Sequence, residues 1–211
     1  FGLLTGTLVM TAFHLGAKEL RQCGAVWRRS ITYAFALGLI GAVASNFGVE
    51  FLLLTGQSQE LAEGGGRIIG ILGWSMPPML IFVATGFFLE GLKQPKVGMY
   101  IMIIGNLFNI ALNWVLVFGH LGAPEMAAAG SAWSTVCVRT IMMTCILYYV
   151  WNLKNHVELG IRKHANLIAA GGWSAWAKLR HIGLGAGASA AIESGAFSSM
   201  SLIAGLLGIL S

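Results

Sequence analysis

The chain has 211 residues, of which 56% are hydrophobic and only 10% charged, and its mean hydropathy is +0.76. Soluble domains carry roughly 25% charged residues, so these values exclude an ordinary soluble domain and indicate an integral membrane protein. In a soluble protein, the net charge of +5 would suggest a nucleic-acid partner. In a membrane protein the distribution of the charges matters more than their sum. We therefore expect no nucleic-acid partner.

Six segments meet or nearly meet the length of about 20 mostly apolar residues that a membrane-spanning helix needs. In chain order they are residues 1–17, 31–54, 68–89, 97–118, 127–151 and 182–210. The sequence therefore predicts an all-α, polytopic membrane protein. Because the chain starts and stops inside apolar stretches, we expect it to be a fragment of a longer polypeptide that lies in the lipid bilayer.

The connectors between these segments alternate in charge. The first, third and fifth connectors hold 11 of the 13 Lys and Arg residues, namely Lys18, Arg21, Arg28, Arg29, Lys93, Lys96, Lys154, Arg162, Lys163, Lys178 and Arg180. Basic connectors stay on the cytoplasmic side of a membrane protein. The pattern thus predicts a multi-pass protein of the cytoplasmic membrane with its odd connectors in the cytoplasm.

Three features of the segments and connectors predict further details of the structure. Pro77 and Pro78 fall inside the third segment and predict a kink, since proline removes a helical hydrogen bond. The glycines at 64–66 are expected to form a flexible outer loop, within a connector at 56–67. The fifth connector, 152–180, ends in an expected amphipathic stretch at the membrane interface, with Trp and basic residues.

The fourth segment carries a stripe of amide side chains. Asn106, Asn109 and Asn113 are spaced i, i+3, i+7, which places them on one face of a helix. Lipid cannot satisfy these groups, so the face should turn toward other helices or a wet cavity. We expect it to line a cavity; simple hydrogen bonding between helices is the alternative.

The fifth segment repeats this pattern with Ser131, Thr135 and Arg139 at i, i+4, i+8. Arg139 lies near the middle of the segment, so it should also face inward and pair with a carboxylate. The sequence places Cys23, Cys137 and Cys145 at no spacing suited to a metal, and we predict no metal apart from a coupling ion. Paired carboxylates and nucleophile–base sets are lacking at membrane depth, which argues against an enzyme.

Glu193 is the charged residue that lies within the sixth segment, between Gly, Ala, Ser and aliphatic residues. A carboxylate at the centre of a bilayer costs about 2.5–3.5 kcal/mol. Such a residue is by default a functional one, and we predict that Glu193 binds a proton or a cation during transport.

Three pieces of the sequence, in order and at matching spacing, resemble the multidrug and toxic-compound extrusion (MATE) family, in its NorM-like branch. They are Phe88-Leu-Glu-Gly-Leu-Lys-Gln-Pro-Lys, Asn106-Leu-Phe-Asn-Ile-Ala-Leu-Asn and Phe118-Gly-His-Leu-Gly-Ala-Pro-Glu-Met. The resemblance implies helices 2 to 7 of a twelve-helix protein built from two bundles. Residues 1–152 would then be helices 2–6 of the first bundle, 153–180 a cytoplasmic linker, and 181–211 the first helix of the second bundle.

The resemblance also implies a function and roles for several residues. MATE proteins export drugs and toxic organic cations in exchange for sodium ions or protons, without a cofactor. Glu193 would be the cation-coupling carboxylate, with a sodium ion as one option, and Asn109, Asn113 and Thr135 would line the first bundle's cavity. Asn106 and Arg139 join the expected cavity from the residue pattern alone.

The sequence departs from the family pattern at two positions, where Gly185 replaces a proline and His14 a glutamine. Two other functions stay open: a lipid-linked oligosaccharide flippase of the same superfamily, and a channel. The expected partners of the transporter are small amphiphilic or cationic drugs, and the full-length protein is expected to work as a monomer.

Overall fold

The computed structural model describes residues 2–54, 56, 58–122 and 126–162, and from the rest of the chain residues 177, 181, 183–189, 192, 193, 195 and 196. Throughout these residues the regular structure is helical and contains no strand. This result confirms the predicted all-α fold class. The expected amphipathic stretch and most of the sixth apolar segment lie outside the described residues.

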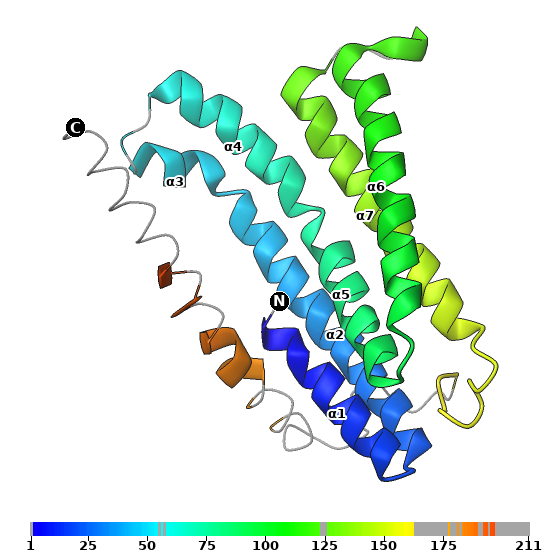
Figure 1. The fold of residues 1–211 in the computed structure, drawn as a ribbon. Coiled ribbons are helices and arrows are strands. Elements are labelled where there is room, and N and C mark those ends of the chain that lie inside the picture. Colours follow the sequence, from blue (N-terminus) through cyan, green and yellow to red (C-terminus); the bar gives the residue numbers. More distant parts are fainter. Residues whose placement is uncertain are drawn as a thin grey trace, which may run out of the picture.

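The helices of the described part run roughly side by side and form an elongated bundle (Figure 1). In chain order they are η1 (Gly2–Leu4), α1 (Thr5–Gly16), α2 (Leu20–Ser45), α3 (Gly48–Leu54), α4 (Gln59–Gly73), α5 (Met76–Gly91), α6 (Pro95–Phe118), η2 (His120–Gly122) and α7 (Ala127–Trp151). The connectors after α1, α5 and α7 lie at one end of the bundle (Figure 1). The connectors that the sequence shows to be basic therefore share one end.

Two helices of the described part, α6 and α7, are individually long and apolar enough to cross a membrane. The pairs α2 with α3 and α4 with α5 reach the same length and hydropathy if each bent pair counts as one span. α7 covers the residues predicted for the fifth segment, and α6 begins two residues before the fourth. α2 begins at Leu20, well before the predicted segment at 31–54, because the basic residues of the first connector continue the helix.

Both bent pairs break over a few residues. The axes of α2 and α3 differ by 57°, and those of α4 and α5 by 42°. α5 starts at Met76, so Pro77 and Pro78 occupy its first turn, where the missing N–H groups would have had no helical partner. The predicted kink in the third segment is confirmed, and it lies just before the two prolines.

The predicted loop at 64–66 is wrong, because these glycines lie inside α4. A Cβ atom on Gly66 would lie 2.8 Å from the backbone N of Val49 on α3. The glycines therefore let α3 and α4 pack closely, as small residues do between membrane helices. The real connector between α3 and α4 is limited to residues 55–58.

The two breaks lie beside each other. A Cβ atom on Gly73, the last residue of α4, would lie 2.5 Å from the Cβ of Ser45, the last residue of α2. Each break also supplies its own hydrogen bonds: the Ser45 hydroxyl donates to the carbonyl of Gly41 over 2.8 Å, and the Ser75 hydroxyl to that of Leu72 over 2.6 Å. These bonds give the two serine hydroxyls a partner within the chain, which lipid could not supply.

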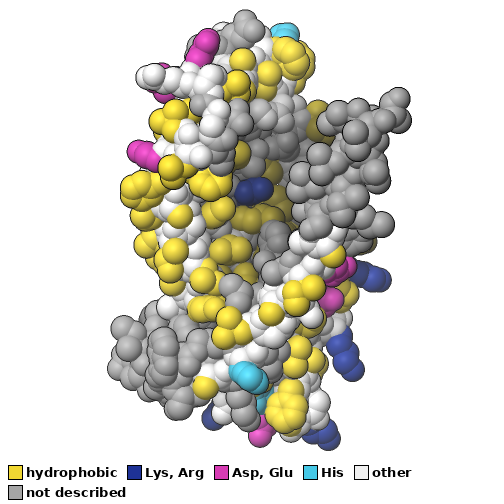
Figure 2. Space-filling model, turned by 90° about the vertical axis from the view of Figure 1, so that its left-hand side faces the viewer, with side chains coloured by type: hydrophobic (Ala, Val, Ile, Leu, Met, Phe, Trp, Pro, Cys, Tyr) yellow, Lys and Arg dark blue, Asp and Glu magenta, His cyan; other side chains and the backbone are white. Residues whose placement is uncertain are grey.

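The buried core lies between α2, α5 and α7. Trp27 of α2 packs against Phe88 of α5, with ring centroids 5.8 Å apart, and Ile146 and Val150 of α7 belong to the same cluster. Outside this core the surface is strongly apolar. Figure 2 shows hydrophobic side chains over much of the middle of one face, with most of the visible Lys and Arg side chains in its lower half. Such a surface suits a lipid environment.

Candidate functional site

Two of the three asparagines on α6 join α7 in a line of hydrogen bonds. The Asn113 amide nitrogen donates to the amide oxygen of Asn109 over 2.9 Å, and the Asn109 amide nitrogen donates to the hydroxyl of Ser134 over 3.3 Å. The Ser134 hydroxyl lies 3.4 Å from the backbone carbonyl of Asn109, to which it donates. Ser134 is fully buried. This Asn109–Asn113–Ser134 line therefore faces between the two helices and away from lipid.

Small residues bring α6 and α7 close enough for this line to form. A Cβ atom on Gly130 of α7 would lie 2.4 Å from the carbonyl oxygen of Leu116 on α6, and one on Gly105 of α6 would lie 2.6 Å from the sulfur of Met142. Glycine at such positions lets two helix backbones approach. Close contacts at Gly105 and at Gly130 thus hold the two helices together near the polar line.

One atom of this line is left without a donor. The amide oxygen of Asn113 is buried and accepts no hydrogen bond from the described residues. Buried polar atoms in proteins are nearly always paired, and an unpaired one costs about 1–3 kcal/mol. A hydrogen-bond donor brought against this buried oxygen would satisfy it.

Asn106 and Thr135 take no part in this line. Asn106 is exposed on α6. The Thr135 hydroxyl donates over 3.0 Å to the carbonyl of Ser131 in the same helix. Of the predicted cavity residues, the described structure joins Asn109 to Asn113 by a hydrogen bond; Asn106, Thr135 and Arg139 are not hydrogen-bonded to them.

Arg139 reaches the break in the other bent pair. Its guanidinium donates to the hydroxyl of Ser75, which is fully buried between α4 and α5. The sequence predicts a carboxylate partner for Arg139; the partner in the described part of the chain is a hydroxyl, and that prediction is wrong. A serine hydroxyl does not neutralise charge, so the Arg139 guanidinium remains a positive charge beside the break between α4 and α5.

Glu193 lies in helical backbone and is exposed in the structure. Among the described residues no ion pair or hydrogen bond of its carboxylate is found, and no group of three or more His, Cys, Asp or Glu side chains could hold a metal ion. The predicted coupling role of Glu193 therefore rests on its position in the sequence alone.

Sequence reasoning missed Ser134 and Ser75. Ser134 lies one position before Thr135, outside the i, i+4, i+8 stripe of α7, and a small hydroxyl residue gives no strong signal in an apolar helix. Ser75 directly precedes the Met76-Pro77-Pro78 sequence. A serine just before a helix start is a common capping signal, and this signal could have identified it.

Comparison with known proteins places the chain in one family. The family model MatE matches residues 1–115, which is more than half of the chain. The probable multidrug resistance protein NorM of Caulobacter vibrioides is 38% identical over 97% of this chain, and the protein of that name from Rhizobium meliloti is 30% identical over 74%. The chain covers 43% and 33% of these two relatives, so it spans less than half of their length.

Two solved structures share the fold. The crystal structure of a eukaryotic MATE transporter has a TM-score of 0.76 and 15% identity, covering 88% of this chain and 40% of that one. A multidrug resistance MATE family transporter in its inward-facing conformation has a TM-score of 0.74 and 17% identity, covering 87% of this chain and 40% of that one. The chain therefore belongs to the MatE family, whose members are transporters and not enzymes.

Proposed function

We propose that this chain is part of an antiporter that exports drugs and toxic organic cations in exchange for sodium ions or protons. The observation that carries the proposal is the Asn109–Asn113–Ser134 line, a polar site between two apolar helices with one unpaired oxygen. The names of the relatives support export of drugs, since they are described as multidrug resistance proteins.

The division of the chain follows from this proposal. Residues 1–152 are helices 2–6 of the first bundle, 153–180 are the linker, and 181–211 begin the second bundle. α6, α7 and the two bent pairs would supply up to four membrane spans of the first bundle, and α1 (Thr5–Gly16) would be part of a fifth. The full-length protein would function as a monomer, without a cofactor.

The unpaired amide oxygen of Asn113 suits a weakly held cationic substrate. A carboxamide oxygen can accept a hydrogen bond from an ammonium or an amidine without the strong attraction of a carboxylate. Export requires that the drug is released as well as bound. A neutral acceptor such as the Asn113 amide oxygen would allow both. Asn106, Thr135 and Arg139 lie along the same two helices and would line the remainder of the cavity.

Glu193 would couple the cation gradient to export. A carboxylate can bind either a proton or a sodium ion, and further oxygen ligands beside it would favour sodium. One charge moved across 100 mV supplies about 2.3 kcal/mol. Since about 1.4 kcal/mol corresponds to a tenfold change in an equilibrium constant, one exchanged ion supports a drug gradient of about 40-fold. One carboxylate is therefore enough to drive useful export.

The orientation follows from charge. The connectors after α1, α5 and α7 share one end of the bundle (Figure 1) and carry most of the Lys and Arg residues. The positive-inside rule places that end in the cytoplasm. In the proposed arrangement the short connectors after α3 and α6 face the opposite side of the cytoplasmic membrane.

The direct test is ethidium efflux from drug-hypersensitive cells that express the full-length parent, with and without sodium, beside its Glu193→Gln variant. We expect export that depends on a cation gradient and is lost in the variant, at unchanged protein level in the membrane. Normal export by Glu193→Gln would remove its coupling role. Export unaffected by gradient collapse would point to a channel, and no export at all to a flippase of lipid-linked oligosaccharides.

A further inference from the structure

A cavity of about 460 Å³ lies at the end of the bundle that carries the basic connectors. It is lined by residues from three distant parts of the sequence: the turn after α1, the turn after α5, and the end of α7 with the segment that follows it. The described bundle thus forms one concave site where all three basic connectors meet.

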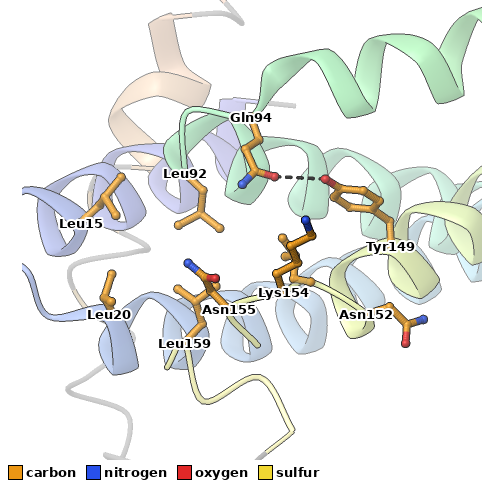
Figure 3. Close-up of a pocket in the computed structure, with 10 residues that line it drawn as sticks. Leu15, Leu20, Leu92, Gln94, Tyr149, Asn152, Lys154, Asn155 and Leu159 are labelled. Carbon is orange, nitrogen blue, oxygen red and sulfur yellow. Dashed lines mark hydrogen bonds between the residues drawn. The ribbon is translucent and has the colours of Figure 1, made fainter. Parts of the chain in front are cut away.

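The lining of this cavity is divided into an apolar and a polar part. Five leucines supply the apolar part: Leu15, Leu20, Leu92, Leu153 and Leu159. The polar part comes from amide side chains, a tyrosine and a lysine. The Tyr149 hydroxyl donates to the amide oxygen of Gln94 over 3.2 Å, which leaves the amide nitrogen of Gln94 free to donate to a ligand (Figure 3).

Lys154 provides the positive charge of the cavity. Figure 3 shows its ammonium group on the same side as Gln94 and Tyr149, with Asn155 nearby on the lining. Among the described residues no carboxylate pairs with Lys154. Its charge is therefore available to an anion, and the amide groups of Gln94 and Asn155 belong to the same lining.

The segment that carries Lys154 is held in place by its own contacts. The Arg28 guanidinium of α2 donates to the carbonyl of Gly160, and the Arg162 guanidinium donates to that of Trp151 over 2.9 Å. A Cβ atom on Gly24 would also clash with the carbonyl of Leu159, at 2.0 Å. The wall of the cavity is therefore packed against α2.

Charge around the cavity also favours an anion. The described connectors at this end contribute Lys18, Arg21, Lys93, Lys96, Lys154 and Arg162. Against them stand Glu90, Glu158 and Glu19, the last already paired with His14 over 2.8 Å. Tyr149 and Trp151 lie at the end of the spanning helix α7, a depth at which aromatic residues meet the lipid headgroups.

We propose that this cavity binds one acidic phospholipid from the cytoplasmic leaflet. Its phosphate would contact Lys154 and the amide groups of Gln94 and Asn155, and its glycerol and upper acyl chain would lie on the leucines. An anionic head joined to an apolar tail matches both parts of the lining, whereas a cationic drug would meet repulsion at Lys154. Basic pockets between helices on the cytoplasmic side bind acidic lipid headgroups in this way.

The test uses the purified full-length parent in detergent, titrated with phosphatidylglycerol or with phosphatidylcholine. Thermal unfolding reports stabilisation, and native mass spectrometry counts retained lipid. We expect phosphatidylglycerol alone to stabilise the protein. Lys154→Gln should raise the phosphatidylglycerol concentration for half-maximal stabilisation about fivefold, and Asn155→Trp, which fills the cavity without a change of charge, should abolish the response. Lys154→Arg should retain it.

Lys96→Gln is the matched control, because Lys96 is exposed at the same end but does not line the cavity. Equal losses in Lys96→Gln and Lys154→Gln would overturn the proposal in favour of general surface attraction. Stabilisation by inorganic phosphate alone, or displacement of the lipid by ethidium, would also overturn it. The proposal requires only that the chain lies in a membrane, so its outcome is separate from that of the efflux test.

Discussion

The α2/α5 pair and the α6/α7 pair are held together in different ways. α2 and α5 each bury eight residues, and Gly38 brings the α2 backbone against Pro77 of α5. α6 buries only Gly105 among its described residues. Its exposed large side chains are Met99, Tyr100, Met102, Ile103, Ile104, Leu107, Phe108, Ile110, Trp114 and Phe118.

This difference shows which contacts stabilise each helix pair. α2 and α5 find most of their partners within the described chain, so their fit decides whether the bundle forms. α6 presents apolar side chains to lipid or to further protein, and lipid tails attract such side chains as well as another helix does. The α6/α7 pair therefore depends on glycine contacts and on the Asn109–Asn113–Ser134 line.

The largest effect is expected from Gly38→Ala in the α2/α5 pair. A Cβ atom there would lie 2.4 Å from the Cα of Pro77, and a rigid backbone cannot move away easily. We expect a loss of about 3 kcal/mol in the free energy of unfolding. The yield of monodisperse full-length protein should fall as a consequence. Gly86→Ala, on α5 with no atom within 4 Å of the added Cβ, is the control, and an equal yield would contradict the packing argument.

A smaller effect is expected where α7 meets the bent pair. Ser75→Ala removes the hydroxyl that accepts from Arg139, leaving part of a guanidinium unpaired at a cost of about 2 kcal/mol. Thermal unfolding of Ser75→Ala, Arg139→Gln and the double variant gives the coupling between them. Additive losses would mean that the bond contributes nothing. Ser131→Ala, on the exposed side of α7, is the control.

The polar line of the α6/α7 pair is tested by Asn109→Ala combined with Asn113→Ala. We expect a loss of about 1 kcal/mol in stability, as for other hydrogen bonds between membrane helices, but a strong reduction in ethidium efflux. Cys137→Ala with Cys145→Ala changes two exposed residues of α7 and should leave efflux unchanged. Equal efflux in the two double variants would show that the asparagines serve packing alone.

The smallest effect is expected from Thr135→Val. The Thr135 hydroxyl donates to the carbonyl of Ser131 within α7, so its removal leaves no partner on another helix unpaired. Thermal unfolding should change by less than about 0.5 kcal/mol. An efflux defect as large as that of the asparagine variant would show that Thr135 contributes to transport as much as Asn109 and Asn113 do.

The sequence predicts the fourth and fifth spanning segments well because their apolar length is a strong signal, whereas the second and third segments each correspond to a bent pair of helices with other bounds. α7 has the predicted bounds, and α6 differs by two residues. The sequence predicts a loop for the glycine run at 64–66, because three glycines disfavour an isolated helix. In the structure they are required by the close approach of α3. Contact with a distant helix cannot be read from local composition.

The candidate site was predicted in part, for a similar reason. Helical spacing placed Asn109 and Asn113 on one face, and the structure joins them to each other. Spacing within one helix does not identify the residue opposite, so Ser134 and Ser75 were missed. The roles of these residues and of Glu193 in transport stay predictions until efflux is measured.

The adjacent breaks at Ser45 and Gly73 have a mechanical consequence. Beyond them α3 and α4 pack backbone to backbone, with Gly66 against Val49. α3 and α4 should therefore move as one rigid unit. A rotation of one of them at its break would then move the other by the same amount. The distance between spin labels on α3 and α4 should stay constant. The distance from a label on α3 or α4 to one on α7 would report any rotation of this unit.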